Sequence, residues 1–190
     1  MASLSQTRVG MTLEEFLKLP EESPSLEYID GRVEAKVSPQ KRHGVIQGEL
    51  NAHFNQFARP LRVGMAFPEL RCTFAGRSIV PDVVFLLKEH IDLDKQGEVA
   101  DVTPYPPDIH VEIISPEQPV RTSHEKLVHS TSYGCSLGWL IHPYRKSVDV
   151  YRPGQPIEKR GPADVLEGDP ILPGYLLPVA ELFGWLKPNF

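Results

Sequence analysis

Apolar and polar positions near the start of the chain predict a short helix followed by a β-hairpin. Thr12 and Glu15 form a Thr-x-x-Glu capping box, and the helix that it opens is expected to end near Pro20. Residues 26–31 are typical of a strand that ends in an Asp-Gly turn. Side chains of the return strand alternate between an apolar and a charged face: Val33, Ala35 and Val37 against Arg32, Glu34 and Lys36.

A longer helix is predicted to follow this hairpin. Ser38 and Pro39 have the residue types of an N-cap and a first helical position, and the helix is expected to end before Pro60. We expect Gly44 and Gly48 to allow close packing of this helix on a sheet. Its larger apolar residues recur at helical spacing and form one stripe: Ile46, Leu50, Phe54 and Phe57.

The remaining pattern predicts strands with one further helix between them. A second capping box, Thr122 with Glu125, is expected to open a helix that runs to about Tyr133 and stops at Gly134. Strands are expected near 62–67, 69–74, 79–87, 108–114, 135–141 and 147–151.

This order of elements predicts an α/β (α+β) fold in which helices flank a mixed β-sheet, with an extra N-terminal hairpin and C-terminal strands. No repeat or linker divides the chain, so we expect a single domain over residues 1–190 with a core at about 12–151. The remainder, 152–190, is rich in proline and glycine and is expected to end in a helical turn at 179–183.

Composition and charge exclude several classes of protein. Apolar residues make up 41% and charged residues 24%, and no apolar run is long enough to cross a membrane. The net charge of −5 disfavours a protein that coats nucleic acid nonspecifically, although acidic metal ligands of an enzyme would contribute to it. The first residues lack a signal-peptide core, and Cys72 and Cys135 are too few for a disulfide framework, so a cytoplasmic protein is expected.

Two carboxylates in apolar segments are the strongest candidates for chemistry. The sequence lacks the common nucleotide-binding, zinc-protease and serine-hydrolase motifs, so no organic cofactor is expected. Asp82 follows Pro81 at the start of an apolar run, and Glu112 lies inside the apolar segment 109–114. A carboxylate among valines and isoleucines is costly to bury unless something pairs with it. Two such strands side by side could place both carboxylates on one divalent cation.

The step of 30 residues from Asp82 to Glu112 resembles the spacing in the PD-(D/E)XK nuclease superfamily. More narrowly, the chain resembles a bacterial family of putative restriction endonucleases that is known as a domain of unknown function. The similarity rests on an ordered set of motifs rather than on any single one: Leu26–Gly31, His43, Pro81–Val83, Val111–Pro116, Glu125–Lys126, Gly134, Trp139 and Pro143.

The resemblance implies a restriction-endonuclease-like fold and a Mg²⁺- or Mn²⁺-dependent endonuclease that hydrolyses phosphodiester bonds of nucleic acid, DNA in particular. Asp82, Glu112 and Glu27 would hold the metal. Lys126 would orient the attacking water or neutralise the scissile phosphate, and His43 would lean from its helix toward the sheet. A symmetric homodimer is expected, because duplex cleavage needs two active sites.

The sequence departs from the superfamily at three positions. The superfamily lysine would occupy position 114, two residues after Glu112, but this position is Ile114; the resemblance implies that Lys126 of the following helix replaces it. Thr122 and Ser130 stand where the narrower family has Asp and Tyr. These losses leave open a binding module whose catalytic centre has decayed, and the acids alone also allow a hydrolase of small phosphoesters.

Each candidate also has a plainer structural explanation. Asp82 could cap a turn, and Glu112 could form a buried ion pair with an arginine. Lys126 and Glu27 could be solvated surface residues, and His43 could be a buried histidine with satisfied hydrogen bonds.

Overall fold

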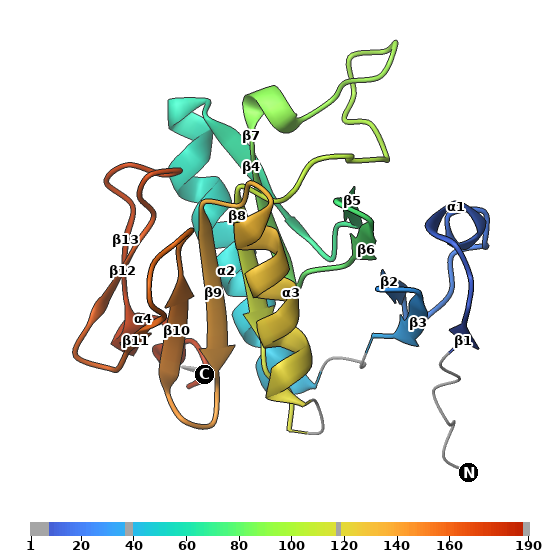
Figure 1. The fold of residues 1–190 in the computed structure, drawn as a ribbon. Coiled ribbons are helices and arrows are strands. Elements are labelled where there is room, and N and C mark those ends of the chain that lie inside the picture. Colours follow the sequence, from blue (N-terminus) through green and yellow to red (C-terminus); the bar gives the residue numbers. More distant parts are fainter. Residues whose placement is uncertain (1–7, 37–39, 117–118, 188–190) are drawn as a thin grey trace.

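The computed structural model describes residues 8–36, 40–116 and 119–187, and a six-stranded central sheet lies in its middle (Figure 1). Strands β8 and β9 are parallel and are joined by helix α3 (Val120–Ser132), whereas the other neighbouring pairs are antiparallel. The predicted mixed sheet is therefore confirmed. Across the sheet the strands are β11 (Glu158–Arg160), β10 (Ser147–Tyr151), β9 (Leu137–His142), β8 (Ile109–Ile113), β7 (Val83–Leu87) and β4 (Gly64–Pro68).

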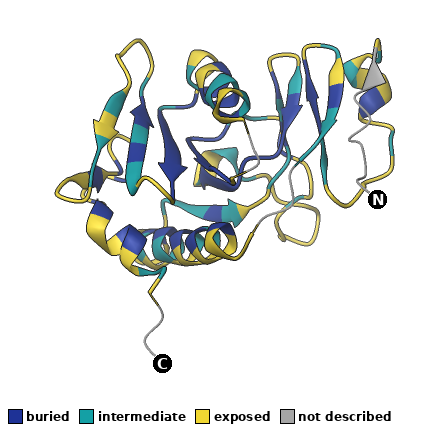
Figure 2. Cartoon of the chain, turned by 90° about the horizontal axis from the view of Figure 1, so that it is seen from below, coloured by how far each residue is buried: buried dark blue, intermediate teal, exposed yellow. Residues whose placement is uncertain are grey.

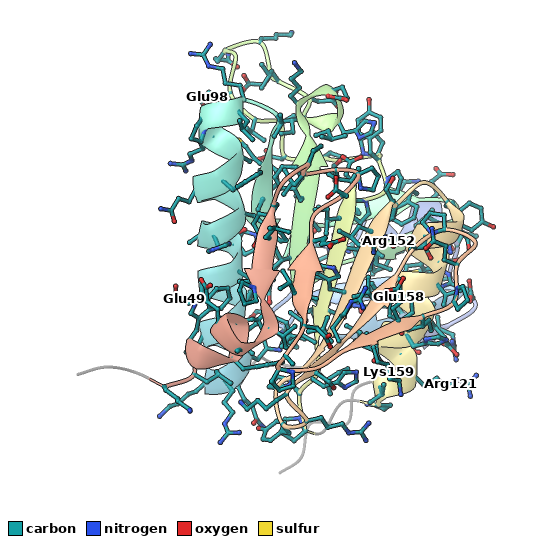
Figure 3. All side chains as sticks on the ribbon, turned by 90° about the vertical axis from the view of Figure 1, so that its left-hand side faces the viewer. Glu49, Glu98, Arg121, Arg152, Glu158 and Lys159 are labelled. Carbon is teal, nitrogen blue, oxygen red and sulfur yellow. The ribbon has the colours of Figure 1, made fainter. Side chains whose placement is uncertain are left out.

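Helices cover both faces of the central sheet. The odd-numbered residues of β7, β8 and β9 pack with α2 (Lys41–Leu61), and the predicted stripe is buried except for Phe57, which is partly buried. The even-numbered side of β8 and β9 packs with α3, where Leu127 clusters with Ile114 and Leu140. Figure 2 shows buried strands and helices with one exposed face, and Figure 3 shows Glu49 of α2 and Arg121 of α3 on opposite sides of the sheet.

The C-terminal segment completes the core on the α2 side. β12 (Val165–Glu167) pairs with β13 (Leu176–Pro178), and α4 (Val179–Gly184) follows, which confirms the predicted helical turn. Tyr175 is fully buried, and its ring packs against Phe54 and Trp139. The proline- and glycine-rich extension therefore contributes to the main hydrophobic core.

A second sheet carries the N-terminal hairpin and lies at the other end of the molecule from β12 and β13 (Figure 1). One face packs on α1 (Leu13–Phe16), and the other contacts Val84 and Leu86 of β7 through Ile29 and Ile79. Its strands are, in order, β1 (Arg8–Val9), β3 (Arg32–Ala35), β2 (Leu26–Ile29), β6 (Arg77–Ile79) and β5 (Cys72–Phe74). The hairpin is thus part of a separate sheet that covers one end of the central sheet.

The prediction of one strand over 79–87 is wrong. β6 ends at Ile79 in the second sheet, β7 begins at Val83 in the central sheet, and residues 80–82 connect them. Pro81 interrupts the strand because proline has no N–H for a sheet ladder. The continuous apolar composition of the segment concealed this change of sheet.

Both predicted boundaries of α2 are also wrong. α2 has Gln40 as its N-cap, with Ser38 and Pro39 outside the described residues, and it continues through Pro60 to Leu61. Proline is tolerated there because Arg62 already ends the helix in a left-handed conformation, so little regular helix follows the lost hydrogen bond.

α3 begins at Val120 after the N-cap Pro119, so Thr122 lies inside the helix and is not its N-cap. Glu125 instead pairs with Arg121, one turn earlier, at 2.6 Å. The expected end of α3 is confirmed, with Tyr133 as the C-cap and Gly134 at φ +118°.

Other local predictions are confirmed, with one exception. Thr12 and Glu15 form the capping box, and Asp30 and Gly31 adopt the positive φ angles of a tight hairpin turn. The exception is the pair Gly44 and Gly48, which are exposed and have no described neighbour that an added Cβ would touch.

Both cysteines are free and buried. Burial raises the pKa of the Cys135 thiol to about 12, and it also raises the pKa of the Cys72 thiol. None of the helices in the described ranges combines the length and the apolar character needed to cross a membrane.

Candidate functional site

Asp82 lies where the chain passes from the second sheet into the central sheet. Its side chain is 2% exposed, and the Ile113 N–H donates a hydrogen bond of 2.7 Å to Oδ2. Its own backbone N–H donates to the Val111 carbonyl at 3.1 Å. These bonds fix Asp82 against β8 just before β7 begins.

Glu112 lies next to Asp82 across the β7–β8 pair. Val83 is opposite Val111 in this antiparallel register, so Asp82 and Glu112 come opposite each other and share the face of the sheet that α3 covers. Glu112 is 1% exposed, and its Oε1 lies 2.9 Å from His110 Nε2. The sequence prediction that two strands bring these carboxylates side by side therefore agrees with the strand register.

Lys126 enters the site from the inner face of α3 and is 1% exposed. Its Nζ lies 2.7 Å from Glu112 Oε1 and donates a hydrogen bond of 2.9 Å to Glu27 Oε1. Burial alone would lower the pKa of Lys126, but the carboxylates of Glu112 and Glu27 outweigh it and raise that pKa well above its usual value. Lys126 is therefore a buried, permanently charged ammonium rather than a surface lysine.

Glu27 joins the second sheet to this cluster. It lies on β2, it is buried, and its Oε1 accepts hydrogen bonds from both Lys126 Nζ and the Val80 N–H, the latter at 2.7 Å. The acid that the sequence suggested as a third metal ligand thus has the ammonium of Lys126 as its direct partner.

His43 reaches Asp82 from the first turn of α2. Its Nε2 lies 3.3 Å from Asp82 Oδ1, and its Nδ1 lies 3.3 Å from Ser115 Oγ. One turn further along α2, Gln47 Nε2 donates to the Asp82 carbonyl at 2.9 Å. The N-terminal end of α2 therefore contacts Asp82 from the side opposite α3, as the predicted lean of His43 toward the sheet requires.

Sequence reasoning missed Lys36, at the end of β3. Its Nζ lies 2.7 Å from Asp82 Oδ1 and 3.5 Å from Glu69 Oε1, and its side chain is 8% exposed. The alternation of the return strand placed Lys36 on the charged face, but nothing in the sequence indicates that this face turns toward the central sheet. The position of Glu27 on the same hairpin was the only available signal, because Glu27 and Glu34 are cross-strand partners and Lys36 follows two residues later.

His110 and Ser130 were also missed. The ionised Glu112 can only accept, so His110 donates from Nε2, and its Nδ1 lies within hydrogen-bond distance of the Ser130 hydroxyl, at 2.7 Å. The sequence carried a signal for His110, which precedes Glu112 by two residues and so shares its face of the strand. Ser130, counted as a departure from the family pattern, thus orients a partner of Glu112.

Both central carboxyls are ionised at neutral pH. Burial alone would raise the pKa of Asp82, but the neighbouring His43 side chain and the Lys36 ammonium outweigh it and hold that pKa well below its usual range. Burial and the nearby Asp82 charge favour a higher pKa for Glu112, yet Lys126 and His110 keep it lowered. The site thus maintains two adjacent negative charges in a buried environment.

The donor set fits a cation that takes few protein ligands. Within the described ranges, no three His, Cys, Asp or Glu side chains are grouped as a ready-made metal cage. Asp82 Oδ1, however, is buried and accepts no hydrogen bond from any residue that the structure describes, although Lys36 Nζ and His43 Nε2 lie close to it. Mg²⁺ is commonly held by one or two carboxylates while waters and substrate phosphates complete its shell, which matches Asp82 and Glu112.

Comparison with known proteins agrees with this geometry. The chain is similar in structure to a putative nuclease belonging to DUF820 from Anabaena variabilis ATCC 29413, known from a crystal structure at 1.96 Å resolution. The two are 38% identical with a TM-score of 0.90, and the match covers 93% of this chain and 99% of the other. No curated protein matches the chain.

The Uma2 family, described as putative restriction endonuclease, matches residues 13–180. This range includes the central sheet, the second sheet except for β1, and every candidate residue of the buried cluster. The family match and the shared fold support a nuclease, and they confirm the resemblance drawn from the motifs. The chain belongs to the Uma2 family of putative restriction endonucleases.

Proposed function

We propose that the protein is a Mg²⁺-dependent endonuclease that hydrolyses phosphodiester bonds of DNA, with Mn²⁺ as an alternative metal. The observation that carries this proposal is the pairing of Asp82 with Glu112, two ionised and buried carboxylates on one face of the sheet, next to the buried ammonium of Lys126. Structural ion pairs alone seldom require two adjacent carboxylates in a core, because burying each charge is costly.

Asp82 and Glu112 would hold the metal. A divalent cation at this position supplies Lewis-acid stabilisation of charge on a phosphate and lowers the pKa of water. The protein contributes the fixed geometry: Ile113 N–H orients the Asp82 carboxylate, and His110 orients that of Glu112. His43, tethered by Ser115, is a positioning residue for Asp82.

Lys126 would act on the phosphate that is cleaved. Its ammonium is charged at every working pH and is held by Glu27 and Glu112, so it needs no reorganisation as negative charge develops. Its origin on α3 rather than on β8 supports the replacement of the lysine missing at position 114. Ile114 itself packs among Leu127, Leu140 and Tyr151.

The test is a cleavage assay with matched variants. Wild type with Mg²⁺ or Mn²⁺ should cleave single-stranded, duplex or branched DNA, and Asp82→Asn should lose cleavage. The Asp82→Asn variant should also lose the rise in melting temperature that the metal gives to wild type by mass action. Lys18→Met is the control, because Lys18 is exposed and pairs only with Glu14 among the described residues.

Lys126→Met separates chemistry from metal binding. We expect a loss of cleavage by a factor of about 10² or more, as for other electrostatic stabilisers, with the metal-induced rise in melting temperature retained. The variant should be less stable by about 3–5 kcal/mol, because it leaves two buried carboxylates without their ammonium. Absence of cleavage of any DNA or RNA by wild type would favour a binding module over an enzyme.

A further inference from the structure

Lys36 and Lys126 are two buried ammonium groups in the same cluster, but they are held very differently. Lys126 Nζ donates a hydrogen bond to Glu27 and lies 2.7 Å from Glu112. Lys36 Nζ is equally close to Asp82 Oδ1, at 2.7 Å, yet neither of these two atoms has a hydrogen-bond partner among the described residues. Charge attraction therefore retains Lys36, without the directional bonds that fix Lys126.

The Lys36 ammonium supplies at Asp82 the positive charge that a bound metal ion would supply. It lies against Asp82 Oδ1, which has no hydrogen bond from the described part of the chain, and it compensates one of the three buried acids, Glu27, Asp82 and Glu112. A buried ammonium with three N–H groups and no hydrogen bond to any described residue is poorly satisfied, so replacing it by a better ligand of Asp82 costs little.

The Lys36 ammonium also has a second acidic partner within reach, Glu69. The Lys36 backbone is fixed, because its N–H donates to the Ser25 carbonyl at 2.8 Å, but its four-carbon side chain is flexible. Glu69 Oε1 lies 3.5 Å from the same ammonium, and the Glu69 side chain is 39% exposed. A small rotation of the side chain would move Nζ from Asp82 toward Glu69 and the solvent while keeping it paired.

We propose that Lys36 is an exchangeable internal cation of the metal site. Without metal its ammonium neutralises Asp82, and a divalent cation that binds Asp82 displaces it toward Glu69. The inference rests on the proposed function only in taking Asp82 and Glu112 as the metal site. It adds that metal binding is a competition, so the apparent affinity for metal is weaker than the two carboxylates alone would give.

Calorimetric titration with Mn²⁺, without nucleic acid, tests this competition. Lys36→Met keeps the length of the side chain but removes the competing charge, so it should bind Mn²⁺ at least tenfold more tightly than wild type, or by about 1.4 kcal/mol. Lys18→Met should bind as wild type does. Unchanged or weaker binding by Lys36→Met would mean that Lys36 merely supports the fold or holds Asp82, and would overturn the proposal.

NMR of the lysine ammonium groups in the wild-type protein gives a second test that does not depend on the folding of a variant. Added Mg²⁺ should shift the Lys36 signal toward that of a solvated lysine and speed its proton exchange, whereas Lys126 should stay protected. A Lys36 ammonium that stays protected at saturating Mg²⁺ would contradict displacement. If Asp82→Asn binds metal as wild type does, the metal site itself is wrong and both proposals fail; if only the Lys36 results disagree, the proposed function stands.

Discussion

Asp82 receives contacts from three different parts of the fold, and together they explain how a charged carboxylate is stabilised in this core. The Ile113 N–H comes from the neighbouring strand, Lys36 from the second sheet and His43 from α2. The sum of these interactions exceeds the penalty of burial, so the pKa of Asp82 is lowered. A side chain that could simply have capped a turn is instead a buried charge with partners in three parts of the fold.

Folding stability measured at acid pH should reveal how far these contacts stabilise the charge of Asp82. A carboxyl whose pKa is lower in the folded state binds fewer protons when folded, so its contribution is complete above the unfolded pKa of about 3.9 and is lost as the pH falls toward the folded pKa. Without metal, Asp82→Asn should be less stable than wild type by about 3–5 kcal/mol at pH 6, because Lys36 loses its buried partner. Urea unfolding at about pH 3 should show a smaller difference. A difference that does not change with pH would mean that the charge of Asp82 does not stabilise the fold.

At the scale of elements, the sequence predicted what depends on local pattern. The stripe of α2 and the Asp30-Gly31 turn follow from periodicity and turn chemistry, and both are present. The errors concern tertiary context. Residues 79–87 look like one strand, since apolar composition does not reveal that Pro81 marks a change of sheet.

The residues of the candidate site also divide into those that local sequence pattern predicts and those that depend on tertiary context. Asp82 and Glu112 were predictable because buried acids in apolar strands are rare, and Lys126 was predictable through its family motif. Lys36 was not, because its burial depends on how the second sheet packs on the central sheet, which is a contact between residues far apart in sequence. Strand alternation gives the two faces of a hairpin but not which face is covered.

Two glycines make a matched pair that tests packing of the helices on the sheet. An added Cβ at Gly138 on β9 would lie 2.8 Å from Leu127 Cδ2 on α3 and 3.2 Å from Tyr151 Cβ. Gly138→Ala should therefore destabilise the protein by about 1–3 kcal/mol by overpacking. Gly48→Ala on the exposed side of α2 should stabilise it by about 0.5–1 kcal/mol, since nothing lies within reach and alanine favours helix. Thermal or urea unfolding of both variants measures the difference, and equal effects would contradict the observed packing.

At the scale of the whole molecule, the buried charge cluster is also a connection between the two sheets. Lys126 comes from a helix on the central sheet, and Glu27 comes from a strand of the second sheet. The Val80 N–H, in the segment that joins the sheets, donates to the same Glu27 oxygen. The charges that would perform the chemistry therefore also fix the position of the N-terminal sheet. Loss of one of them should lower the stability of that sheet as well as alter the site.

Glu27→Gln should loosen the second sheet selectively. The amide oxygen can still accept from the Val80 N–H, but the charge-assisted bond to Lys126 is lost, which should lower stability by about 1.5–3 kcal/mol. Because Lys126 keeps Glu112, the central sheet should retain its protection in native-state hydrogen exchange, while the amides of β2 and β3 exchange faster. Glu34→Gln is the control, since Glu34 lies opposite Glu27 on β3 but pairs at 3.7 Å with the half-exposed Arg32. Faster exchange spread evenly over both sheets, or the same effect in Glu34→Gln, would show that the Glu27–Lys126 contact does not hold the sheets together.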